Sequence, residues 1–489
     1  MKKAIVIGAG VAGMATAIRL AKQGWEVHVY ESSAHVGGKL SQKKIGDFRF
    51  DLGPSLFTLP GLVKELFDLC DRDFESEFPM HRLDPITHYF WEDGVVLKAH
   101  ADPQAWSQEI SEKLGEDFNA VLRYFKKANW VYQTTKPVFL ESSLRRLPFR
   151  KWHFWKALFS IPWLPINGTL HRYHRNQFKN PKTIQLMNRY ATYNGSNPYQ
   201  TPAMMSMIPH LEHGIGAYIP THGMHQITGA LGSLMKSSGV NIHLNTPVQE
   251  IVYDQNKVRG VRVNHEVREA DIVVSNVDAY FTYHRLLPHF PKPEKTLKQE
   301  RSSSAIIFYW GMAREFSELD VHNIFFSQDY LAEFNAIFKG KEICNDVTVY
   351  VNITSKQVKQ DAPKGAENWF VMINAPRYEG GDENLVVIKA KETILKKLNA
   401  ILKIRVQDFI VEEDVLTPKG IEERTSSYAG SLYGTASNNR FAAFLRHDNF
   451  IDGLRGLYFV GGSVHPGGGI PLCLQSAKIA SDCIAQDHG

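Results

Sequence analysis

A glycine-rich turn near the start of the chain constrains the fold more than any other feature. The sequence predicts a short β-branched strand over Lys2–Ile7 and a helix over Val11–Gln23. The turn between them carries three glycines in the spacing GxGxxG: Gly8, Gly10 and Gly13. Glycine permits the tight turn and lets a pyrophosphate approach the helix N-terminus. A second strand, EVHVYE, ends in Glu31, whose carboxylate can accept hydrogen bonds from ribose hydroxyls. The sequence therefore predicts a dinucleotide-binding βαβ unit.

Length and composition are those of a globular protein with more than one core region. The chain has 489 residues, and its formal net charge of +5 is too small to indicate a nucleic-acid partner. The cysteines lie far apart in the sequence, so neither a disulfide framework nor a zinc site is expected, and no metal is predicted. This cysteine usage favours a reducing, cytoplasmic location.

Two further segments extend the glycine pattern. HVGGKLSQ places Gly37 and Gly38 before Lys39, and FDLGPSLFTLP follows with Gly53 and Pro54. Paired glycines let the backbone pass close to a flat ligand, and Lys39 offers a cation to a phosphate. The alternative for Lys39 is a solvated turn. A bare GxGxxG does not separate FAD from NAD, whereas these additional segments favour FAD.

The chain resembles the phytoene-desaturase-like carotenoid oxidoreductases over essentially its whole length. The residues that carry the resemblance are, in order, the GxGxxG fingerprint, GGK, DLGPS, LDPITHYFWEDG, YNGSNPYQTPA, GIGAYIPTHGMHQITGAL and GLYFVGGSVHPGGGIP. The resemblance implies that the closing glycine segment completes the flavin site, and that Val248 lies where the backbone meets the adenine. A helix predicted over Leu472–Ala485 then points its N-terminus at the bound ring. Gly461 and Gly468 stand where relatives often have alanine.

The cofactor expected from these patterns is FAD, bound without a covalent link. The residues expected to contact it are Gly8, Gly10, Val11, Ala12, Gly13, Glu31, Gly38, Lys39, Gly53, Pro54, Ser55, Val248, Gly462, Ser463, Gly469 and Ile470.

The expected fold is α/β, with a discontinuous Rossmann-like FAD-binding domain, an α+β substrate domain and a helical membrane-facing cap. The FAD-binding domain is expected from residues 1–67, 215–280 and 445–489. The substrate-binding domain is expected from residues 68–129, 176–214 and 281–444, and the cap from residues 130–175. Within the substrate domain, the apolar segments SSSAIIFYWGM and HNIFFSQDY are predicted to line a tunnel for an apolar substrate.

The expected cap mixes aromatic and basic side chains. Trp152, Trp155 and Trp163 stand among arginines and lysines, and prolines cut the segment into short helices. No apolar run is long enough to span a bilayer, but aromatic residues beside cations suit the surface of an anionic leaflet. We therefore expect a peripheral association with the cytoplasmic membrane. The alternative is that these helices only cover the core of the protein.

No side chain is assigned as catalytic from the sequence. His465, Tyr193, His222 and Tyr433 are candidates, and each has a purely structural alternative. Cys473 raises the possibility of a covalent flavin, but a small buried apolar residue is the preferred interpretation. The sequence has no second GxGxxG fingerprint in the right context to bind a separate nicotinamide beside the flavin. We therefore expect dioxygen or a quinone to be the electron acceptor.

The resemblance implies an FAD-dependent carotenoid desaturase, with hydride transfer to flavin N5. DLGPSLFTLP is closest to the branch that forms a 3,4 double bond in a 1-hydroxylated acyclic end group. The alternatives are a multi-step phytoene desaturase, a carotene isomerase, or a flavoprotein acting on another substrate, such as an amine oxidase or retinol saturase. A lipid escort with the same fold, similar to prenyl-GTPase dissociation inhibitors, is the alternative of another class.

Overall fold

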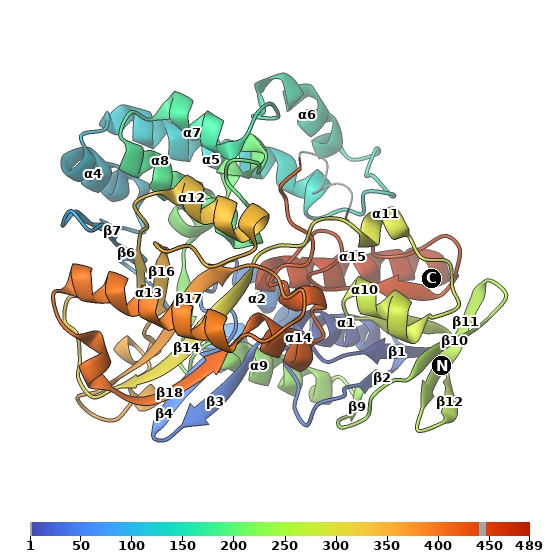
Figure 1. Cartoon of the computed structure of the whole chain (residues 1–489). Helices are drawn as coiled ribbons and strands as arrows, with labels where there is room; N and C mark the ends of the chain where they lie inside the picture. The colour runs from blue at the N-terminus through green and yellow to red at the C-terminus, as the bar shows by residue number, and fades with distance from the viewer. Residues whose placement is uncertain (1, 440–445) are drawn as a thin grey trace.

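A parallel sheet assembled from distant parts of the chain forms one half of the molecule (Figure 1). The computed structural model describes residues 2–439 and 446–489. The sheet has the order β19-β13-β1-β2-β9, and each neighbouring pair is parallel. Its strands are β1 (Lys3–Ile7), β2 (Glu26–Tyr30), β9 (Asn241–His243), β13 (Ile272–Ser275) and β19 (Leu457–Phe459). The start, the middle and the end of the chain therefore meet in this sheet.

Helices α1 (Val11–Lys22), α9 (His225–Ser237) and α15 (Ile470–His488) pack together beside this sheet. β13 is buried at every position, as is typical of a parallel strand covered on both faces. α1 buries alanine, methionine, isoleucine and leucine side chains in the same core cluster as α9 and α15. The sheet carries its loops at the carboxyl ends of the strands, where open α/β folds bind ligands.

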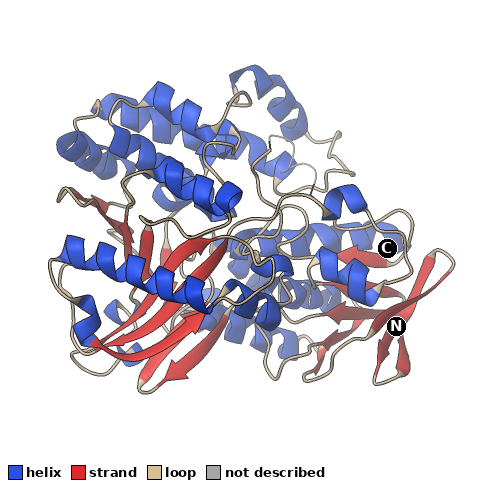
Figure 2. Ribbon diagram, viewed as in Figure 1, coloured by secondary structure: helices blue, strands red, loops and turns tan. Residues whose placement is uncertain are grey.

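A second, larger sheet forms the other half (Figure 2). Its order is β18-β14-β17-β16-β15-β6-β7, with mainly antiparallel pairs and a parallel pair between β15 and β6. α13 (Asn384–Leu402) contributes Ala390, Ile394 and Leu398 to the core on this sheet. The strands are β6 (Thr87–Phe90), β7 (Val96–Ala99), β14 (Ser304–Met312), β15 (His322–Phe325), β16 (Val349–Asn352), β17 (Glu367–Ala375) and β18 (Ile410–Leu416).

Smaller sheets and short helices complete the fold. The small sheets pair β3 (Ser41–Ile45) with β4 (Phe48–Leu52), β5 (Met80–Arg82) with β8 (Tyr218–Pro220), and β10 (Glu250–Asp254) with β11 (Lys257–Val263) and β12 (Glu266–Glu269). The short helices are α2 (Gly61–Leu69), α3 (Phe74–Glu77), α10 (Ala279–Phe281), α11 (Glu294–Leu297), α12 (Tyr330–Asn335) and α14 (Pro418–Thr425).

A helical layer covers the larger sheet at the top of Figure 1. Asp102 and Asp117 are the N-cap residues of α4 and α5. Each side chain accepts a hydrogen bond from a backbone N–H group in the first turn of its helix. α5 runs without a break across the domain boundary expected between residues 129 and 130. The layer consists of α4 (Pro103–Leu114), α5 (Phe118–Phe139), α6 (Trp152–Ser160), α7 (Leu170–Gln177) and α8 (Pro181–Asn188).

Element boundaries differ from the sequence expectation mainly at the last helix. α15 begins at Ile470, two positions before the expected Leu472, and ends at His488. Gly469 has a φ of +99°, which turns the chain into the helix, and Pro471 is tolerated in the first turn because no donor is needed there. Met1 and residue 445, which bound two of the expected FAD-binding segments, lie outside the described residues. Within residues 2–439 and 446–489, no helix is long and apolar enough to cross a membrane.

Candidate functional site

The GxGxxG loop forms a tight cradle at the N-terminus of α1. A Cβ atom added at Gly13 would lie 2.1 Å from the carbonyl oxygen of Gly8, and one added at Gly10 would lie 2.7 Å from Oδ1 of Asn276. No side chain caps the start of the helix at Gly10. The backbone N–H groups of the first turn are therefore suited to an anion, and Val11 and Ala12 lie within that turn.

Glu31 stands at the carboxyl end of β2, beside this cradle. Its Oε2 accepts a hydrogen bond from the Ala9 N–H at 2.7 Å, and its Oε1 accepts one from the Ser33 N–H at 2.9 Å. The side chain is nearly buried, so these bonds fix its orientation. Oε1 also accepts hydrogen bonds from the hydroxyls of Ser33 and Ser32 at 2.9 and 3.3 Å. Oε2, which accepts from Ala9 alone, is therefore the oxygen with capacity for a further donor such as a ribose hydroxyl. Val248 is half-buried against the core next to β10.

The GGK loop lies directly against the first glycine loop. The Gly37 N–H donates to the Ala9 carbonyl at 2.8 Å, and a Cβ at Gly38 would lie 3.3 Å from the Gly10 Cα. The Lys39 ammonium donates to the carbonyls of Ser431 and Leu432 at 3.2 and 2.8 Å, and its side chain lines the central cavity. The structure thus places Lys39 in the cavity wall, and its expected contact with a cofactor phosphate stays a prediction. Burial lowers the pKa of Lys39 to about 8.

The DLGPS segment connects the two halves at β4. Asp51 caps the N-terminus of α9 from outside the helix. Its carboxylate accepts hydrogen bonds from the N–H groups of Met224 and His225 at 2.8 and 3.0 Å. Gly53 has a φ of +118°, and an added Cβ would lie 2.3 Å from the Lys39 carbonyl oxygen. The loop then presents Pro54 and Ser55 to the cavity.

The closing loop between β19 and α15 is held from several sides. The Ser463 hydroxyl oxygen accepts a hydrogen bond from the Ala279 N–H at 3.0 Å. A Cβ at Gly468 would lie 2.7 Å from the Tyr433 Cα, and one at Gly461 would lie 2.6 Å from Nδ2 of Asn276. These contacts explain why glycine rather than alanine occupies both positions. A Cβ at Gly462 would lie 3.2 Å from the Gly468 Cα, so the two arms of the loop also touch.

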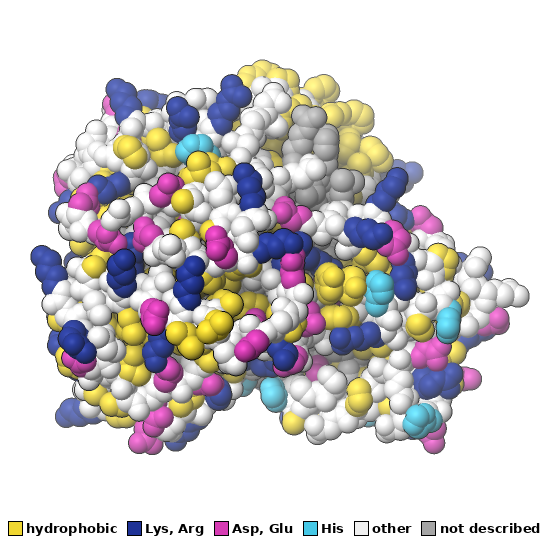
Figure 3. All heavy atoms as spheres, viewed as in Figure 1, with side chains coloured by type: hydrophobic (Ala, Val, Ile, Leu, Met, Phe, Trp, Pro, Cys, Tyr) yellow, Lys and Arg dark blue, Asp and Glu magenta, His cyan; other side chains and the backbone are white. Residues whose placement is uncertain are grey.

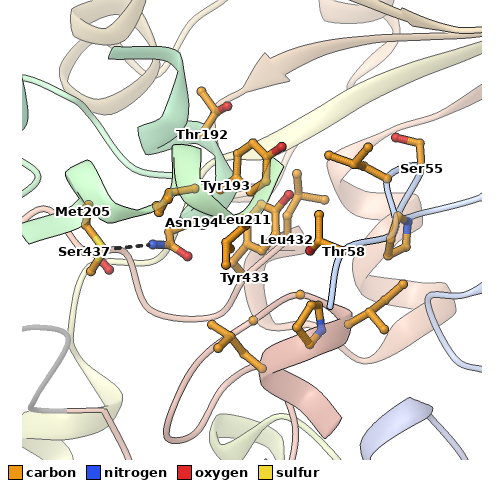
Figure 4. Close-up of a pocket in the computed structure, with 18 of the residues that line it drawn as sticks. Ser55, Thr58, Thr192, Tyr193, Asn194, Met205, Leu211, Leu432, Tyr433 and Ser437 are labelled. Atoms are coloured by element: carbon orange, nitrogen blue, oxygen red, sulfur yellow. Dashed lines mark hydrogen bonds between the residues drawn. The ribbon is translucent and has the colours of Figure 1, made fainter. Parts of the chain in front are cut away.

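A cavity of about 390 Å³ adjoins the closing loop and extends between the larger sheet and the helical layer. Gly469, Ile470, Pro466 and Leu472 form its wall on the loop side, and β14, β15, β16 and β17 contribute side chains opposite. The two segments predicted to line a tunnel supply Ile307, Ile324, His322 and Tyr330. Most of the lining side chains are apolar, and Figure 4 shows part of this wall.

A buried ion pair stands in the cavity wall. Glu212 is 1% exposed and accepts hydrogen bonds from Arg189 at 3.1 Å and from the Tyr190 hydroxyl at 2.8 Å, and its other oxygen accepts one from Tyr193. Burial alone would raise the pKa of Glu212, but the charge of Arg189 and these donors hold that pKa below its ordinary value. Glu212 is therefore a fully engaged carboxylate.

A hydrogen-bonded chain of uncharged groups lies in the same wall. The Tyr350 hydroxyl is 2.7 Å from the Ser55 Oγ and 2.8 Å from the His322 Nδ1. Burial lowers the pKa of His322 to about 4, so the imidazole is neutral near pH 7.

The candidate catalytic residues fall into two groups. Tyr193, Tyr433 and His465 line the cavity, whereas His222 is exposed at the surface and is not part of the cavity wall within the described chain. The His465 Nε2 lies 3.0 Å from the Ser142 carbonyl oxygen, and burial lowers its pKa to about 4. Burial raises the pKa of Cys473 to about 11, so its thiol stays protonated and unreactive at neutral pH.

These groups fit FAD. The glycine cradle leaves no space for a side chain, and Gly10 provides no side-chain cap for α1. Asn276 Oδ1 accepts from the Gly13 N–H, which leaves the N–H groups of Val11 and Ala12 in the first turn for an anion, and Glu31 provides an oriented acceptor at the neighbouring strand end. Within residues 2–439 and 446–489, no group of three or more His, Cys, Asp or Glu residues could hold a metal ion.

Comparison with known proteins assigns the chain to a family. The profile described as "Flavin containing amine oxidoreductase" matches residues 11–485. The chain belongs to the flavin-containing amine oxidoreductase family. It is an oxidoreductase, and its cofactor is FAD.

Relatives that match over the full length of the chain are named as carotenoid desaturases. A protein named 1-hydroxycarotenoid 3,4-desaturase from Flavobacterium sp. (strain P99-3) is 52% identical over 486 residues, covering 99% of both chains. A protein named 4,4'-diapophytoene desaturase (4,4'-diaponeurosporene-forming) from Staphylococcus haemolyticus is 30% identical, also covering 99% of both chains.

Solved structures share the fold at low sequence identity. Putrescine oxidase superposes with a TM-score of 0.64 at 15% identity, covering 99% of both chains. A Rab GDI from Plasmodium falciparum superposes with a TM-score of 0.51 at 15% identity, covering 85% of this chain and 88% of that chain. These similarities establish the flavin-oxidoreductase fold alone.

Sequence reasoning missed several residues of the flavin-oxidoreductase site. Asn276 follows β13, accepts a hydrogen bond from the Gly13 N–H at 3.1 Å and donates to the Val460 carbonyl at 3.1 Å, so it joins the first and last glycine loops. The strand DIVVSN could have indicated it, because polar groups at the ends of parallel strands meet at one sheet edge. Arg189 and Glu212 belong to no recognisable motif and were not predicted.

Proposed function

We propose that the protein is an FAD-dependent carotenoid desaturase that forms a 3,4 double bond in a 1-hydroxylated acyclic end group. The observation that carries the proposal is full-length identity of 52% to a protein of that name, joined to a cavity whose wall is mostly apolar. A polyene is insoluble in water, so its oxidation needs an apolar chamber that meets the flavin. The cavity adjoins the closing glycine loop and provides such a chamber.

The residues around the glycine loops have separate tasks in this proposal. The first turn of α1 holds the pyrophosphate through Gly10, Val11, Ala12 and Gly13, and Glu31 binds the ribose. The closing loop, with Gly462, Ser463, Gly469 and Ile470, holds the isoalloxazine. The N-terminus of α15, at Ile470, would favour negative charge on a ring bound there. The other residues that we assign to the cofactor site are Gly8, Gly38, Lys39, Gly53, Pro54 and Ser55, and we assign Val248 to the adenine.

The reaction removes two hydrogens from neighbouring carbons of the substrate. The bound cofactor supplies a hydride acceptor, and the second hydrogen leaves as a proton. The apolar wall excludes bulk water and holds the polyene extended. Glu212 is not assigned as the base, because its carboxylate is engaged by Arg189, Tyr190 and Tyr193. A conjugated cation delocalises charge, which reduces the demand for a strong base.

The test is a panel of C40 carotenes and 1-hydroxycarotenes incubated with purified holoenzyme. Lengthening of the conjugated chain shifts the absorption of the polyene to longer wavelength, and mass spectrometry reports the loss of two hydrogens. Conversion of the hydroxylated substrates supports the proposal. Conversion of phytoene through several steps would favour the multi-step desaturase, and flavin without any turnover would favour a lipid-binding role.

We also propose dioxygen or a membrane quinone as the electron acceptor. We assign the Rossmann-like parallel sheet, with its GxGxxG loop, to FAD. This assignment leaves a nicotinamide without a binding element of its own in the described chain. Anaerobic incubation with one acceptor at a time tests this. Product formed with NADP alone, beyond the amount of bound flavin, would contradict it.

We further propose that α6 and its flanking turns dock on the cytoplasmic membrane. Trp152, Phe159 and Trp163 are 75%, 66% and 67% exposed, which is unusual for large apolar side chains that lie so close together. Figure 3 shows hydrophobic side chains gathered at the top of the view, in the region of α6. Arg150 and Lys151 precede α6 and Lys156 lies within it, which suits an anionic lipid surface.

The docking surface also adjoins the cavity. Phe139 at the end of α5 lines the cavity, as do Leu140 and Leu144 in the segment between α5 and α6. An apolar substrate that leaves the bilayer at α6 would therefore enter the cavity without crossing water.

Replacing Trp152, Trp155 and Trp163 with serine should reduce co-sedimentation with anionic liposomes while the flavin content stays constant. A matched control replaces Leu385, Val386 and Ile388 of α13, which are also exposed but lie on another face of the structure. If both triple variants sediment like the parent protein, α6 does not dock on membranes.

A further inference from the structure

Tyr433 carries a free phenol hydroxyl in the cavity wall. Among the tyrosines that line the cavity, Tyr193 donates to Glu212, and Tyr350 is bonded to Ser55 and His322. The hydroxyls of Tyr132, Tyr330 and Tyr433 make no such bond to the described residues, and of these three Tyr433 is the one that contacts the closing loop. The phenol of Tyr433 has no hydrogen-bond partner among the described residues, although its side chain lines the same cavity. Buried polar groups are almost always hydrogen-bonded, so a free donor in an apolar wall points to a ligand.

The backbone of Tyr433 is fixed against the closing loop. Its N–H donates to the Ser302 Oγ at 3.0 Å, and its carbonyl accepts a hydrogen bond from Arg446 at 3.3 Å. Cβ atoms added at Gly434 and Gly468 would lie 2.7 Å from the Cα atoms of Ser463 and Tyr433 respectively. Tyr433 therefore has little freedom to move away from the loop that we assign to the isoalloxazine.

The phenol remains a donor at physiological pH. Burial raises the pKa of Tyr433 to about 12, so the hydroxyl stays protonated. Tyr433, Leu432, Leu211 and Thr58 contribute to the same cavity wall (Figure 4). In such surroundings a hydrogen bond is stronger than in water, and an unpaired donor is correspondingly costly.

The chemistry of the proposed substrate places its hydroxyl close to the reacting bond. The hydroxyl is on C1, and the new double bond joins C3 and C4, so the hydroxylated carbon is two bonds from the nearer reacting carbon. A group that binds this hydroxyl must therefore stand beside the flavin, not at a distant end of the cavity. Tyr433 meets this requirement, because it contacts the closing loop.

We propose that the phenol hydroxyl of Tyr433 donates a hydrogen bond to the C1 hydroxyl of the substrate and thereby positions the C3–C4 bond at the flavin. This inference rests on the proposed function and adds the residue that determines its substrate specificity. A carotene without the hydroxyl leaves the phenol unpaired in a dry cavity. Sites built around such a bond discriminate strongly against the analogue that lacks it.

The test compares Tyr433→Phe with the parent holoenzyme on two carotenoids that differ only in the C1 hydroxyl. Removing the phenol oxygen should lower kcat/KM for the hydroxylated substrate about tenfold, the effect of losing one hydrogen bond in an apolar site. The value for the non-hydroxylated carotene should fall much less, so the preference for the hydroxyl shrinks. The matched control is Tyr330→Phe, because Tyr330 lines the same cavity from α12. Its preference should match that of the parent.

Equilibrium binding provides a readout that does not need turnover. Quenching of tryptophan fluorescence by each carotenoid reports its affinity for the oxidised holoenzyme, and Tyr433→Phe should lose affinity for the hydroxylated form selectively. Equal losses for both carotenoids, or a loss of preference in Tyr330→Phe instead, would overturn the assignment of Tyr433. A parent enzyme that converts neither carotenoid would contradict the proposed function, while the binding comparison would still test Tyr433.

Discussion

The two sides of the closing loop are built from different chemistry. On the cofactor side, glycines, backbone N–H groups and a single oriented carboxylate form the site, and added Cβ atoms would collide with neighbouring backbone or with Asn276. On the cavity side, bulky side chains from the larger sheet and the helical layer form the wall, with the buried Arg189–Glu212 pair among them. The first side depends on close approach of the main chain, and the second depends on side-chain shape and on paired charges.

This difference has a consequence for mutational tolerance. A backbone cradle fails when any side chain is added, because the obstruction is steric. A side-chain wall tolerates apolar exchange of similar volume but fails when one member of a buried charged pair is removed. Substitutions on the two sides should therefore separate loss of flavin from loss of stability.

The largest expected effect is on the cavity side. Arg189→Met leaves the Glu212 carboxylate buried without its cation and should lower the free energy of unfolding by about 3–5 kcal/mol. Denaturant unfolding measures the change. The double variant Arg189→Met, Glu212→Leu removes both charges and should recover most of the loss. A double variant as unstable as the single one would show that packing, not charge, is decisive there.

The next effect is on the cofactor side. Gly13→Ala places a Cβ 2.1 Å from the Gly8 carbonyl oxygen, so the loop must shift and the purified protein should lose flavin. The accompanying destabilisation should be about 1–3 kcal/mol, as for other overpacked sites. Gly229→Ala is the matched control, since a Cβ at Gly229 in α9 meets nothing within 4 Å. Full flavin content in Gly13→Ala would contradict the proposed position of the pyrophosphate.

A smaller effect is expected at Glu31. Glu31→Gln removes the charge while keeping the shape of the side chain, and it should weaken FAD binding about tenfold, because hydrogen bonds to a charged acceptor are the stronger ones. Glu31→Arg should weaken binding further by placing a cation where the ribose needs an acceptor. Titration of the apoprotein with FAD measures both. Glu26→Gln on the same strand is the control, and unchanged affinity in the Glu31 variants would remove Glu31 from the site.

The smallest effect is on pH dependence, and it involves both sides. Burial lowers the pKa of His465 in the closing loop and of His322 in the cavity wall to about 4, from 6.5 for an unperturbed histidine. The unfolded chain therefore binds more protons between these values, and stability falls as the pH drops below 6.5. Substituting either residue with glutamine should reduce this slope by at most about 1.4 kcal/mol per pH unit. Unfolding curves at pH 7, 6 and 5 check the change, and an unaltered slope in both variants would contradict it.

The spacing of the residues on the cofactor side could be read from the sequence. On the cavity side, two lining segments were predicted, but the buried Arg189–Glu212 pair was not. Gly8, Gly10, Gly13 and Glu31 stand close together in the chain, so their spacing predicts their geometry before any tertiary contact is known. The strand and helix limits around them differ from the expectation by a residue or so. The contacts of these residues with FAD remain predictions.

Arg189 and Glu212 illustrate why the cavity was harder. They come from η2 (Arg189–Asn194) and η4 (Leu211–Ile215), and only tertiary folding determines that both face the cavity. Of the candidates named from the sequence, Tyr193, Tyr433 and His465 line the cavity, whereas His222 lies at the surface. The carbonyl partners of Lys39, Ser431 and Leu432, are nearly four hundred residues away in sequence, so the GGK motif could not indicate them.

The order of the strands in the parallel sheet also bears on how the protein is made. β1 and β2 emerge first from the ribosome, β9 and β13 of the same sheet follow only about halfway along the chain, and β19 follows near its end. Lys2 and Trp25 contact His488 at the end of α15, so the earliest and latest segments pack on each other (Figure 1). Contacts between such distant segments form late, because closing long loops is entropically costly. FAD capture should therefore be a post-translational event, and until then the apolar edge of β1 is left for chaperones to protect.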